Sequence, residues 1–539
     1  MSANIENNVD KQTKKCYNPK VKVKMFVTTL QKGNIKMKIQ ILDGEYWWFG
    51  QVNAAHHMPL TKESDFDGDM CNAEGCDQFT PSGVSSKGRY IWSEKAFKYG
   101  VHGGFITVDA DDAVLSEGHG NLRGAYLDMC QKHFKPTGTT PDLLFLRRPQ
   151  YNTWIELKTN QNEESILEYA RNIVKNGLPT GIFMIDGGWQ EDNGYYDFNR
   201  RKIPHPHELI KELHALGFKV MVWVSPIVSS AGTRYKELRD KGYLVMTKSG
   251  DPAIRKWWSG FSAVLDFSNP GAVAWFDGEL EYLMKEYGID GFKFDAGDIY
   301  FYDDDDVTYA PTTAREQTKL FNLLGEKYAL NEFRSAWNCG GHPIVARLQD
   351  KRHDWVNGLD MLLPHTIAQG LAGYSYCCPD MVGGGEVQCF DTEDGIDSEL
   401  FIRWAQANSL MGMMQLSIAP WRIFNKDIFE IIKKAIIMHD KVGEYCVELA
   451  KHASVTGEPI VRHMCYVYPN EDFESVGDQF MLGDKYLVAP VLTKGCRERT
   501  VKLPKGFKWK SDRGEIFEGG KVITEEAPLD RLIHYERID

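Results

Sequence analysis

Expected strands and helices alternate along the middle of this 539-residue chain, and this alternation limits its fold more than any other feature. The expected elements lie, in chain order, at 151–157, 165–175, 181–186, 207–216, 220–224, 273–287 and 291–295. Strands separated by helices of roughly 10 to 15 residues are typical of parallel sheets with crossover helices. About 280 residues of this pattern predict a (β/α)8 barrel of the α/β class.

The segments on either side of this region have a different pattern. From 21 to 142, short alternating runs such as 21–27 and 104–108 are broken by Gly, Asp and Pro, which is typical of an antiparallel β unit. A helical stretch and then strand-like runs at 486–491 and 499–503 follow the barrel. We therefore expect a β unit, a barrel and a second, smaller β unit, at 1–142, 143–438 and 439–539.

The charge of the chain excludes one class of partner. Its formal net charge is -12, whereas nucleic-acid binding relies on clustered Lys and Arg that neutralise phosphates. We therefore expect no nucleic-acid partner and a small neutral substrate. Residues 1–15 are polar and contain no apolar stretch suited to a signal peptide or a membrane span, so we expect a cytoplasmic protein without a membrane partner. A homo-oligomer is an open alternative to a monomer.

The sequence gives no reason to expect a metal or a cofactor. The 11 cysteines are scattered, and neither the pair Cys71 and Cys76 nor the pair Cys377 and Cys378 has zinc-ligand spacing with a second pair nearby. We expect reduced thiols. The glycine run 383–385 lacks the lysine and spacing of a phosphate-binding loop. The acidic run Asp303 to Asp306 is expected to be a solvated loop.

One expected strand carries two charged residues on the same face. Side chains alternate along a strand, so Phe292 and Phe294 point to one face while Lys293 and Asp295 point to the other. Burying an ammonium and a carboxylate without partners would cost several kcal/mol. These two charges must therefore satisfy each other or meet a ligand, which indicates a site.

Polar and aromatic residues occur at the ends of other expected strands as well. Asp186 follows one apolar strand, Trp223 interrupts another, and Asp295 closes a third. Barrels of this class carry their reactive groups at the C-terminal ends of the strands. Aromatic faces beside carboxylates suit a sugar, whose C–H face stacks on a ring and whose hydroxyls bind charged groups.

Three motifs in the same order give the chain a family resemblance. The run 292–295 is similar to the nucleophile motif of glycoside hydrolase family 31, and the runs 265–270 and 379–384 reinforce this similarity, which extends from about Ser85 to Pro504. The resemblance implies a retaining, exo-acting α-glycosidase that hydrolyses terminal α-linked sugars. It also implies that the β units on either side of the barrel are β-sandwiches.

The same resemblance assigns roles to individual residues. Asp295 matches the nucleophile and Asp350 the acid/base. The residues that it implies for substrate binding are Asp186, Trp189, Trp223, Lys293, Arg334, Asp380 and Trp421. Simpler roles stay open for several of these: core packing for the tryptophans at 189 and 223, a loop cap for the aspartate at 380, and a structural ion pair for the arginine at 334.

A retaining mechanism places demands on the two carboxyl groups. They must lie about 5 to 5.5 Å apart, because one attacks the anomeric carbon while the other protonates the departing oxygen. Lys293 favours ionisation of Asp295, and an ionised Asp295 disfavours ionisation of Asp350, so we expect opposite protonation states. Lys351 and Arg352 follow the acid/base directly and are expected to face solvent.

The sugar and the reaction class have alternatives. Family α-glucosidases usually carry a histidine near the end of the last barrel strand, and the comparable stretch 413–421 has none. We therefore prefer an α-galactoside, with an α-glucoside or α-xyloside as the alternative. A Schiff-base lyase using Lys293 and a carbohydrate-binding protein without turnover are the alternatives from other classes. His56 and His57 are expected to be a surface pair.

Overall fold

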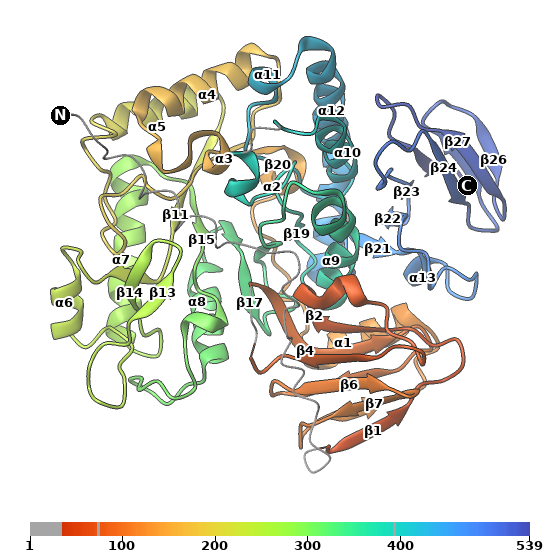
Figure 1. The fold of residues 1–539 in the computed structure, drawn as a ribbon, viewed down its shortest axis with the longest axis horizontal. Coiled ribbons are helices and arrows are strands. Elements are labelled where there is room, and N and C mark those ends of the chain that lie inside the picture. The colour runs from red at the N-terminus through yellow and green to blue at the C-terminus, as the bar shows by residue number, and fades with distance from the viewer. Residues whose placement is uncertain (1–34, 73–75, 392–394) are drawn as a thin grey trace, which may run out of the picture.

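The computed structural model describes residues 35–72, 76–391 and 395–539. These residues form a barrel with a β unit from each end of the chain packed beside it (Figure 1). The strand expected at 21–27 and the polar segment 1–15 lie outside the described residues.

Eight parallel strands build the barrel, which confirms the predicted fold. They are hydrogen-bonded in the order β19-β18-β16-β15-β11-β10-β9-β20. Across the remaining gap between the first and last of these, the Val382 N–H donates to the Gln415 carbonyl at 2.8 Å. The strands are β9 (Gln150–Asn152), β10 (Ile182–Ile185), β11 (Lys219–Val224), β15 (Gly291–Phe294), β16 (Leu330–Phe333), β18 (Val345–Arg347), β19 (Cys377–Cys378) and β20 (Gln415–Leu416).

Helices follow the barrel strands, and α7 (Pro270–Tyr287) illustrates how the sequence sets their bounds. The Asn269 side chain accepts from the Gly271 N–H, Pro270 occupies the first turn, and Gly288 ends the helix with φ of 77°. The other barrel helices are α4 (Glu163–Lys175), α5 (Pro206–Ala215), α8 (Ala314–Gly325), α9 (Asp360–Leu371), α10 (Ser398–Asn408), α11 (Pro420–Ile423) and α12 (Lys426–Thr456). The expected helices at 165–175, 207–216 and 273–287 are confirmed.

The expected strand at 151–157 needs a correction. It ends at Asn152, and a short helix, α3 (Trp154–Leu157), follows. The Asn152 side chain accepts from the Trp154 N–H at 2.8 Å, which turns the chain out of the strand.

A second unpredicted feature is an insertion between β11 and α7, with the elements β12 (Ile227–Ser229), α6 (Tyr235–Asp240), β13 (Arg255–Trp257) and β14 (Gly260–Val264).

The described residues of the N-terminal unit form two sheets that face each other. One has the order β1-β7-β6-β3, and the other contains β4, β5 and β8, with β2 paired to β4. The rings of Phe49 and Tyr99, one from each sheet, stack at 3.9 Å. The strands are β1 (Met37–Gln40), β2 (Trp47–Gln51), β3 (Phe66–Asp69), β4 (Asp77–Ser85), β5 (Tyr90–Trp92), β6 (Lys98–His102), β7 (Phe105–Val108) and β8 (Val114–Ser116).

The N-terminal unit and the barrel share a sheet. Strand β17 (Ser335–Trp337) follows directly on barrel strand β16 and pairs in parallel with β4. Figure 1 shows β17 leaving the barrel toward the orange strands of the N-terminal unit. Two short helices, α1 (Leu122–His133) and α2 (Leu144–Arg147), then lead the chain into β9.

The C-terminal unit is a six-stranded sheet with an additional pair of strands. The six strands have the order β21-β22-β23-β28-β25-β26, and β24 pairs with β27. Buried Arg403 of α10 joins this unit to the barrel by donating to backbone carbonyls, among them that of Ala527 at 2.6 Å. The elements are β21 (Val461–His463), α13 (Met464–Val467), β22 (Phe480–Leu482), β23 (Tyr486–Val488), β24 (Glu498–Lys502), β25 (Lys508–Ser511), β26 (Ile516–Glu518), β27 (Val522–Glu526) and β28 (His534–Arg537).

The expected domain boundary at 438/439 lies inside α12, which continues to Thr456 before the first strand of the C-terminal unit begins at Val461. Within the described ranges, no helix is both long enough and apolar enough to cross a membrane.

Replacing Gly291 by Ala tests how tightly β15 and β16 pack in the barrel. A Cβ at this position would lie 2.1 Å from the Leu330 carbonyl oxygen, so backbone would have to move. We expect the free energy of unfolding, measured by urea denaturation, to fall by about 1 to 3 kcal/mol. The matched control is Gly278→Ala on the exposed face of α7, where a Cβ meets nothing within 4 Å. This change should raise the free energy of unfolding by up to about 1 kcal/mol. Equal effects at both positions would contradict this packing.

Candidate active site

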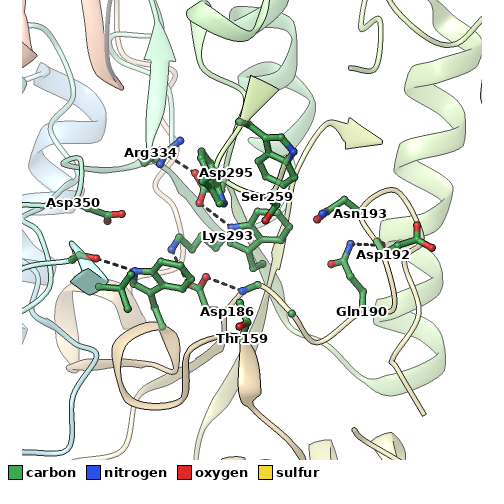
Figure 2. Close-up of a pocket in the computed structure, with 18 of the residues that line it drawn as sticks. Thr159, Asp186, Gln190, Asp192, Asn193, Ser259, Lys293, Asp295, Arg334 and Asp350 are labelled. Atoms are coloured by element: carbon green, nitrogen blue, oxygen red, sulfur yellow. Dashed lines mark hydrogen bonds and ion pairs between the residues drawn. The ribbon is translucent and has the colours of Figure 1, made fainter. Parts of the chain in front are cut away.

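A cavity of about 610 Å³ opens at the C-terminal ends of the barrel strands. Its size falls within the range of small-molecule sites. Figure 2 shows the polar residues that line it. Most residues predicted from the sequence are among its lining: Asp186, Trp223, Lys293, Asp295, Arg334 and Asp350.

Strand register brings these residues together. Across three neighbouring parallel strands, Trp223 lies opposite Lys293, and Lys293 lies opposite Glu332. The two faces of β15 differ as predicted: Phe294 stacks on Phe333 at 4.7 Å in the layer outside the barrel, while Lys293 is 3% exposed inside it. The alternation of side chains therefore delivers the charges to the cavity.

Two hydrogen bonds and one ion pair hold the Asp295 carboxylate. The Trp223 indole N–H donates to Oδ2 at 2.8 Å, the Ala296 N–H donates to Oδ1 at 2.8 Å, and the Arg334 guanidinium forms an ion pair with Oδ1 at 3.0 Å. Burial alone would raise the pKa of Asp295, but the charges of Arg334 and Lys293 outweigh it and lower this pKa to about 2. Asp295 is therefore an ionised, buried carboxylate.

The backbone next to Asp295 is strained. Ala296 has φ of 54°, in the left-handed region that non-glycine residues rarely adopt. This conformation turns the Ala296 N–H back onto the carboxylate. Strained residues cost free energy and cluster at functional sites, so this turn makes Asp295 a candidate functional residue.

The predicted pair of Lys293 and Asp295 needs a correction. The Lys293 ammonium contacts Asp186 Oδ2 at 2.7 Å, and both side chains are buried. Burial favours the neutral amine, yet Asp186 and Asp295 hold the pKa of Lys293 above its ordinary value. The ion-pair partner of Asp295 is Arg334, which also binds buried Asp298 at 2.6 Å. Lys293 acts on Asp295 through its charge alone.

Asp350 lies in a more open part of the cavity. Its side chain is 28% exposed, compared with 8% for that of Asp295. Arg347, at the end of β18, donates to Asp350 Oδ1 at 2.8 Å and to Asp380 Oδ1 at 3.1 Å. Burial and the neighbouring charge of Asp350 raise the pKa of Asp380. One arginine therefore bridges an accessible carboxyl group and a buried one.

Three predicted substrate-binding residues do not line the cavity. Trp189 is fully buried and donates to the Trp223 carbonyl at 2.8 Å, so it supports that strand from behind. Asp380 is fully buried behind Arg347. Trp421 packs against Tyr169 in the helical layer, with ring centroids 5.9 Å apart. A tryptophan or aspartate in the sequence does not reveal whether it points into a cavity or into the core beside it.

The expectation for Lys351 is also wrong, although its neighbour behaves as predicted. Lys351 is 3% exposed, and its N–H donates to Asp380 Oδ2 at 2.5 Å. The Lys351 ammonium donates to the Gln349 carbonyl at 3.3 Å. The Arg352 side chain is 58% exposed and pairs with Glu386 at 3.3 Å.

The sequence prediction missed several residues at the cavity. Trp257 and Trp258 reach it from the insertion, Trp154 from α3, and Gln190 from the loop after β10. The Arg334 guanidinium lies 4.7 Å from the Trp258 ring centroid. The adjacent tryptophans at 257 and 258, two positions before Gly260, were the available sequence signal.

The cavity has two chemically different sides. Figure 2 shows Gln190, Asp192 and Asn193 together on one side, away from the cluster of Arg334, Asp295 and Lys293. Gln190 is 6% exposed, and its side-chain oxygen has no hydrogen-bond partner in the described structure. Carboxylates, a guanidinium, amides and several indoles around one cavity can bind a polyhydroxylated ligand and transfer a proton to or from it.

No metal site emerges from the part of the chain that the structure describes. Within these ranges, no group of three or more His, Cys, Asp and Glu side chains is arranged to hold an ion. In the acidic run, Asp304 pairs with Arg315, Asp305 with Lys248 and Asp306 with Arg255.

Two family models match the chain. Residues 150–439 match the glycosyl hydrolases family 31 TIM-barrel domain, and residues 457–537 match the glycosyl hydrolase family 31 C-terminal domain. The first match follows the barrel from β9 into α12, and the second contains every strand of the C-terminal unit.

Curated relatives and solved structures agree with these matches. The chain is 31% identical to the mouse (Mus musculus) myogenesis-regulating glycosidase over 416 residues, which cover 75% of this chain and 57% of that protein. It is 26% identical to an α-xylosidase of Lactiplantibacillus pentosus over 430 residues, which cover 72% of this chain and 53% of that protein. The chain thus spans only about half the length of these curated relatives.

A solved structure with a similar fold is a Flavobacterium johnsoniae dextranase complexed with glucose. The TM-score is 0.79 at 20% identity, with 93% of this chain and 66% of the dextranase chain covered. This similarity extends beyond the barrel, because the barrel model matches only residues 150–439.

Replacing Arg334 by Gln tests the electrostatic basis of the site. The change leaves Asp295 and Asp298 buried without their shared cation, so the free energy of unfolding at pH 7 should fall by about 3 to 5 kcal/mol. In the wild type, the lowered pKa of Asp295 contributes stability that is present above pH 3.8 and is lost as the pH falls toward about 2. Urea denaturation at several pH values should therefore show that the wild type and Arg334→Gln differ less in free energy of unfolding as the pH falls.

The matched control is Arg171→Gln, which removes an exposed ion pair with Glu212. Its effect should stay within about 1 kcal/mol. Equal losses for the two variants at pH 7 would contradict the role of Arg334 in holding the buried carboxylates.

Proposed function

Since the chain belongs to glycosyl hydrolase family 31, we propose that it is a retaining, exo-acting α-glycosidase with Asp295 as nucleophile and Asp350 as acid/base. The observation that carries this proposal is the contrast between two carboxyl groups that line one cavity. Asp295 is buried, ionised and held by two hydrogen bonds and an ion pair, whereas Asp350 is partly exposed and accepts a hydrogen bond from Arg347.

The first half of the reaction breaks the glycosidic bond. An Asp295 oxygen attacks the anomeric carbon while Asp350 gives its proton to the departing oxygen, which leaves a glycosyl ester on Asp295 and a carboxylate at Asp350. The attack neutralises the charge of Asp295. Arg334 and the Trp223 indole stabilise this carboxylate as nucleophile and again when it leaves.

The second half releases the sugar. Asp350, now a carboxylate, takes a proton from a water molecule while the water oxygen attacks the anomeric carbon. The bond between this carbon and the Asp295 oxygen then breaks. Two displacements at the same carbon retain its configuration. The ion pair of Asp186 and Lys293 lies in the same cavity and supplies a fixed acceptor and donor for sugar hydroxyls.

For the sugar, the preferred proposal is an α-galactoside. It rests on the family resemblance and on the stretch 413–421 at the last strand, which lacks the histidine expected of an α-glucosidase. An α-glucoside or α-xyloside is the alternative, supported by the names of relatives such as the α-xylosidase of L. pentosus and the α-glucosidase 2 of Bacillus thermoamyloliquefaciens.

Two functions from other classes have weaker support. A Schiff-base lyase needs a neutral lysine as nucleophile, but the pKa of Lys293 is raised by its carboxylate neighbours against the effect of burial. A carbohydrate-binding protein without turnover would need no ionised nucleophile beside a second, accessible carboxyl group. A cytoplasmic location and the absence of nucleic-acid and membrane partners stay predictions from the sequence, and a homo-oligomer stays an open alternative.

A panel of 4-nitrophenyl α-glycosides tests the proposed activity. The wild type should cleave the α-galactoside faster than the α-glucoside and α-xyloside. Because the nucleophile forms the covalent bond, Asp295→Ala should lower kcat about 10⁴-fold or more. The matched control is Asp305→Asn, which removes an exposed carboxylate paired with Lys248 and should leave kcat unchanged.

Failure of the wild type to cleave any of these glycosides faster than Asp295→Ala would contradict the enzymatic proposal. A faster reaction with the α-glucoside or α-xyloside would overturn only the choice of sugar.

A further inference from the structure

A buried carboxylate of the N-terminal unit lies next to the site and has no part in the proposed mechanism. Asp77 is the first residue of β4 in the N-terminal unit and is fully buried. It lies opposite Ser335 in the parallel pairing of β4 with β17. The N-terminal unit therefore brings a charged side chain to the edge of the barrel.

Asp77 binds the backbone directly before the acid/base. Its Oδ1 accepts from the Gln349 N–H at 2.7 Å, and Gln349 immediately precedes Asp350. The next residue, Gln78, donates to the Arg334 carbonyl at 2.8 Å and to the Arg347 carbonyl at 3.0 Å. Two consecutive residues of β4 thus hold the segments that carry Arg334, Arg347 and Asp350.

The position of Asp77 costs free energy in three ways. Its φ of 115° is strained for a non-glycine residue. Its Oδ2 has no hydrogen-bond partner in the described structure. This oxygen lies 3.9 Å from Nδ1 of buried His365, and this nitrogen has no hydrogen-bond partner there either. Burial raises the pKa of Asp77 to about 6, against the charge of Lys351, the Gln349 N–H and the charges of Arg347 and Arg334. A side chain that only filled space would incur none of these costs.

We propose that Asp77 is a positioning residue for Asp350. By accepting a hydrogen bond from the Gln349 N–H, it fixes the backbone of residues 349–351, which we call the acid/base loop. It thereby fixes the position from which Asp350 reaches the departing oxygen. The inference rests on the proposed role of Asp350 as acid/base. Lys351, on the other side of Asp350, is anchored by its own N–H to Asp380, so the loop is held from both sides.

The position of an acid matters in proportion to how much the leaving group needs its proton. An alkoxide must be protonated as it departs, so hydrolysis of a methyl glycoside depends on a well-placed acid. Fluoride departs without a proton, so hydrolysis of a glycosyl fluoride needs the nucleophile but little of the acid. The two substrates separate a misplaced Asp350 from a general loss of folded enzyme.

Two substitutions separate the hydrogen bond from the strain. Asp77→Asn keeps an oxygen that can accept from Gln349, and Asn tolerates positive φ. Asp77→Gly removes the acceptor while relieving the strained backbone. Asn470→Gly, at an exposed residue with φ of 63° in the C-terminal unit, is the matched control for a glycine introduced at positive φ.

The first measurement needs no activity. Hydrogen exchange of the full chain, followed by mass spectrometry of peptides that cover Gln349, reports whether its N–H is held. We expect faster exchange in Asp77→Gly than in the wild type, and exchange close to wild type in Asp77→Asn and Asn470→Gly. Unchanged exchange in Asp77→Gly would overturn the proposal.

The second measurement compares kcat/KM for the methyl α-glycoside and the α-glycosyl fluoride of one sugar. In Asp77→Gly, kcat/KM for the methyl glycoside should fall about 10- to 100-fold more than kcat/KM for the fluoride. In Asp77→Asn, most of the kcat/KM for the methyl glycoside should be retained. Equal losses on both substrates, or an Asn variant as impaired as the Gly variant, would overturn the proposal. If the wild type cleaves neither substrate, the proposed function fails, while faster exchange in Asp77→Gly still supports the hold of Asp77 on the loop.

Discussion

The site depends on the pairing of buried charges at the C-terminal end of the barrel. Asp295, Asp298 and Arg334 form one buried group, Asp186 and Lys293 a second, and Asp380 and Arg347 a third that extends to the more accessible Asp350. Desolvation alone would drive the buried carboxyl groups toward their neutral forms. The cations offset this cost, so Asp295 stays ionised where water is largely excluded.

The same network explains why the parts of the chain cannot be considered separately. Strand β4 of the N-terminal unit pairs with β17, and its first residues bind the backbone that carries Arg334, Arg347 and the acid/base loop. The insertion between β11 and α7 contributes Trp257 and Trp258 to the cavity wall. The barrel supplies the charged side chains, and the added segments fix their positions and enclose the cavity.

The barrel and its charged strand could be predicted because they depend on local pattern. Alternating strands and helices define the fold, and the period of two in β15 separates Phe294 from Lys293. The sequence could not reveal that Lys293 would pair with Asp186 rather than Asp295, because that choice depends on the register between β10, β11 and β15. The contact of Asp77 with Gln349 spans 272 positions of sequence, and no local pattern indicates it. Likewise, no local pattern indicates that the Lys351 N–H binds Asp380, 29 positions away.

Trapping of the covalent intermediate is the sharpest test of Asp295 as the nucleophile. A 5-fluoro-α-galactosyl fluoride reacts with the nucleophile of a retaining enzyme and slows the release of the sugar. Mass spectrometry of digested, labelled protein should find the added sugar on Asp295. A label on another residue, or inactivation without a covalent label, would contradict it.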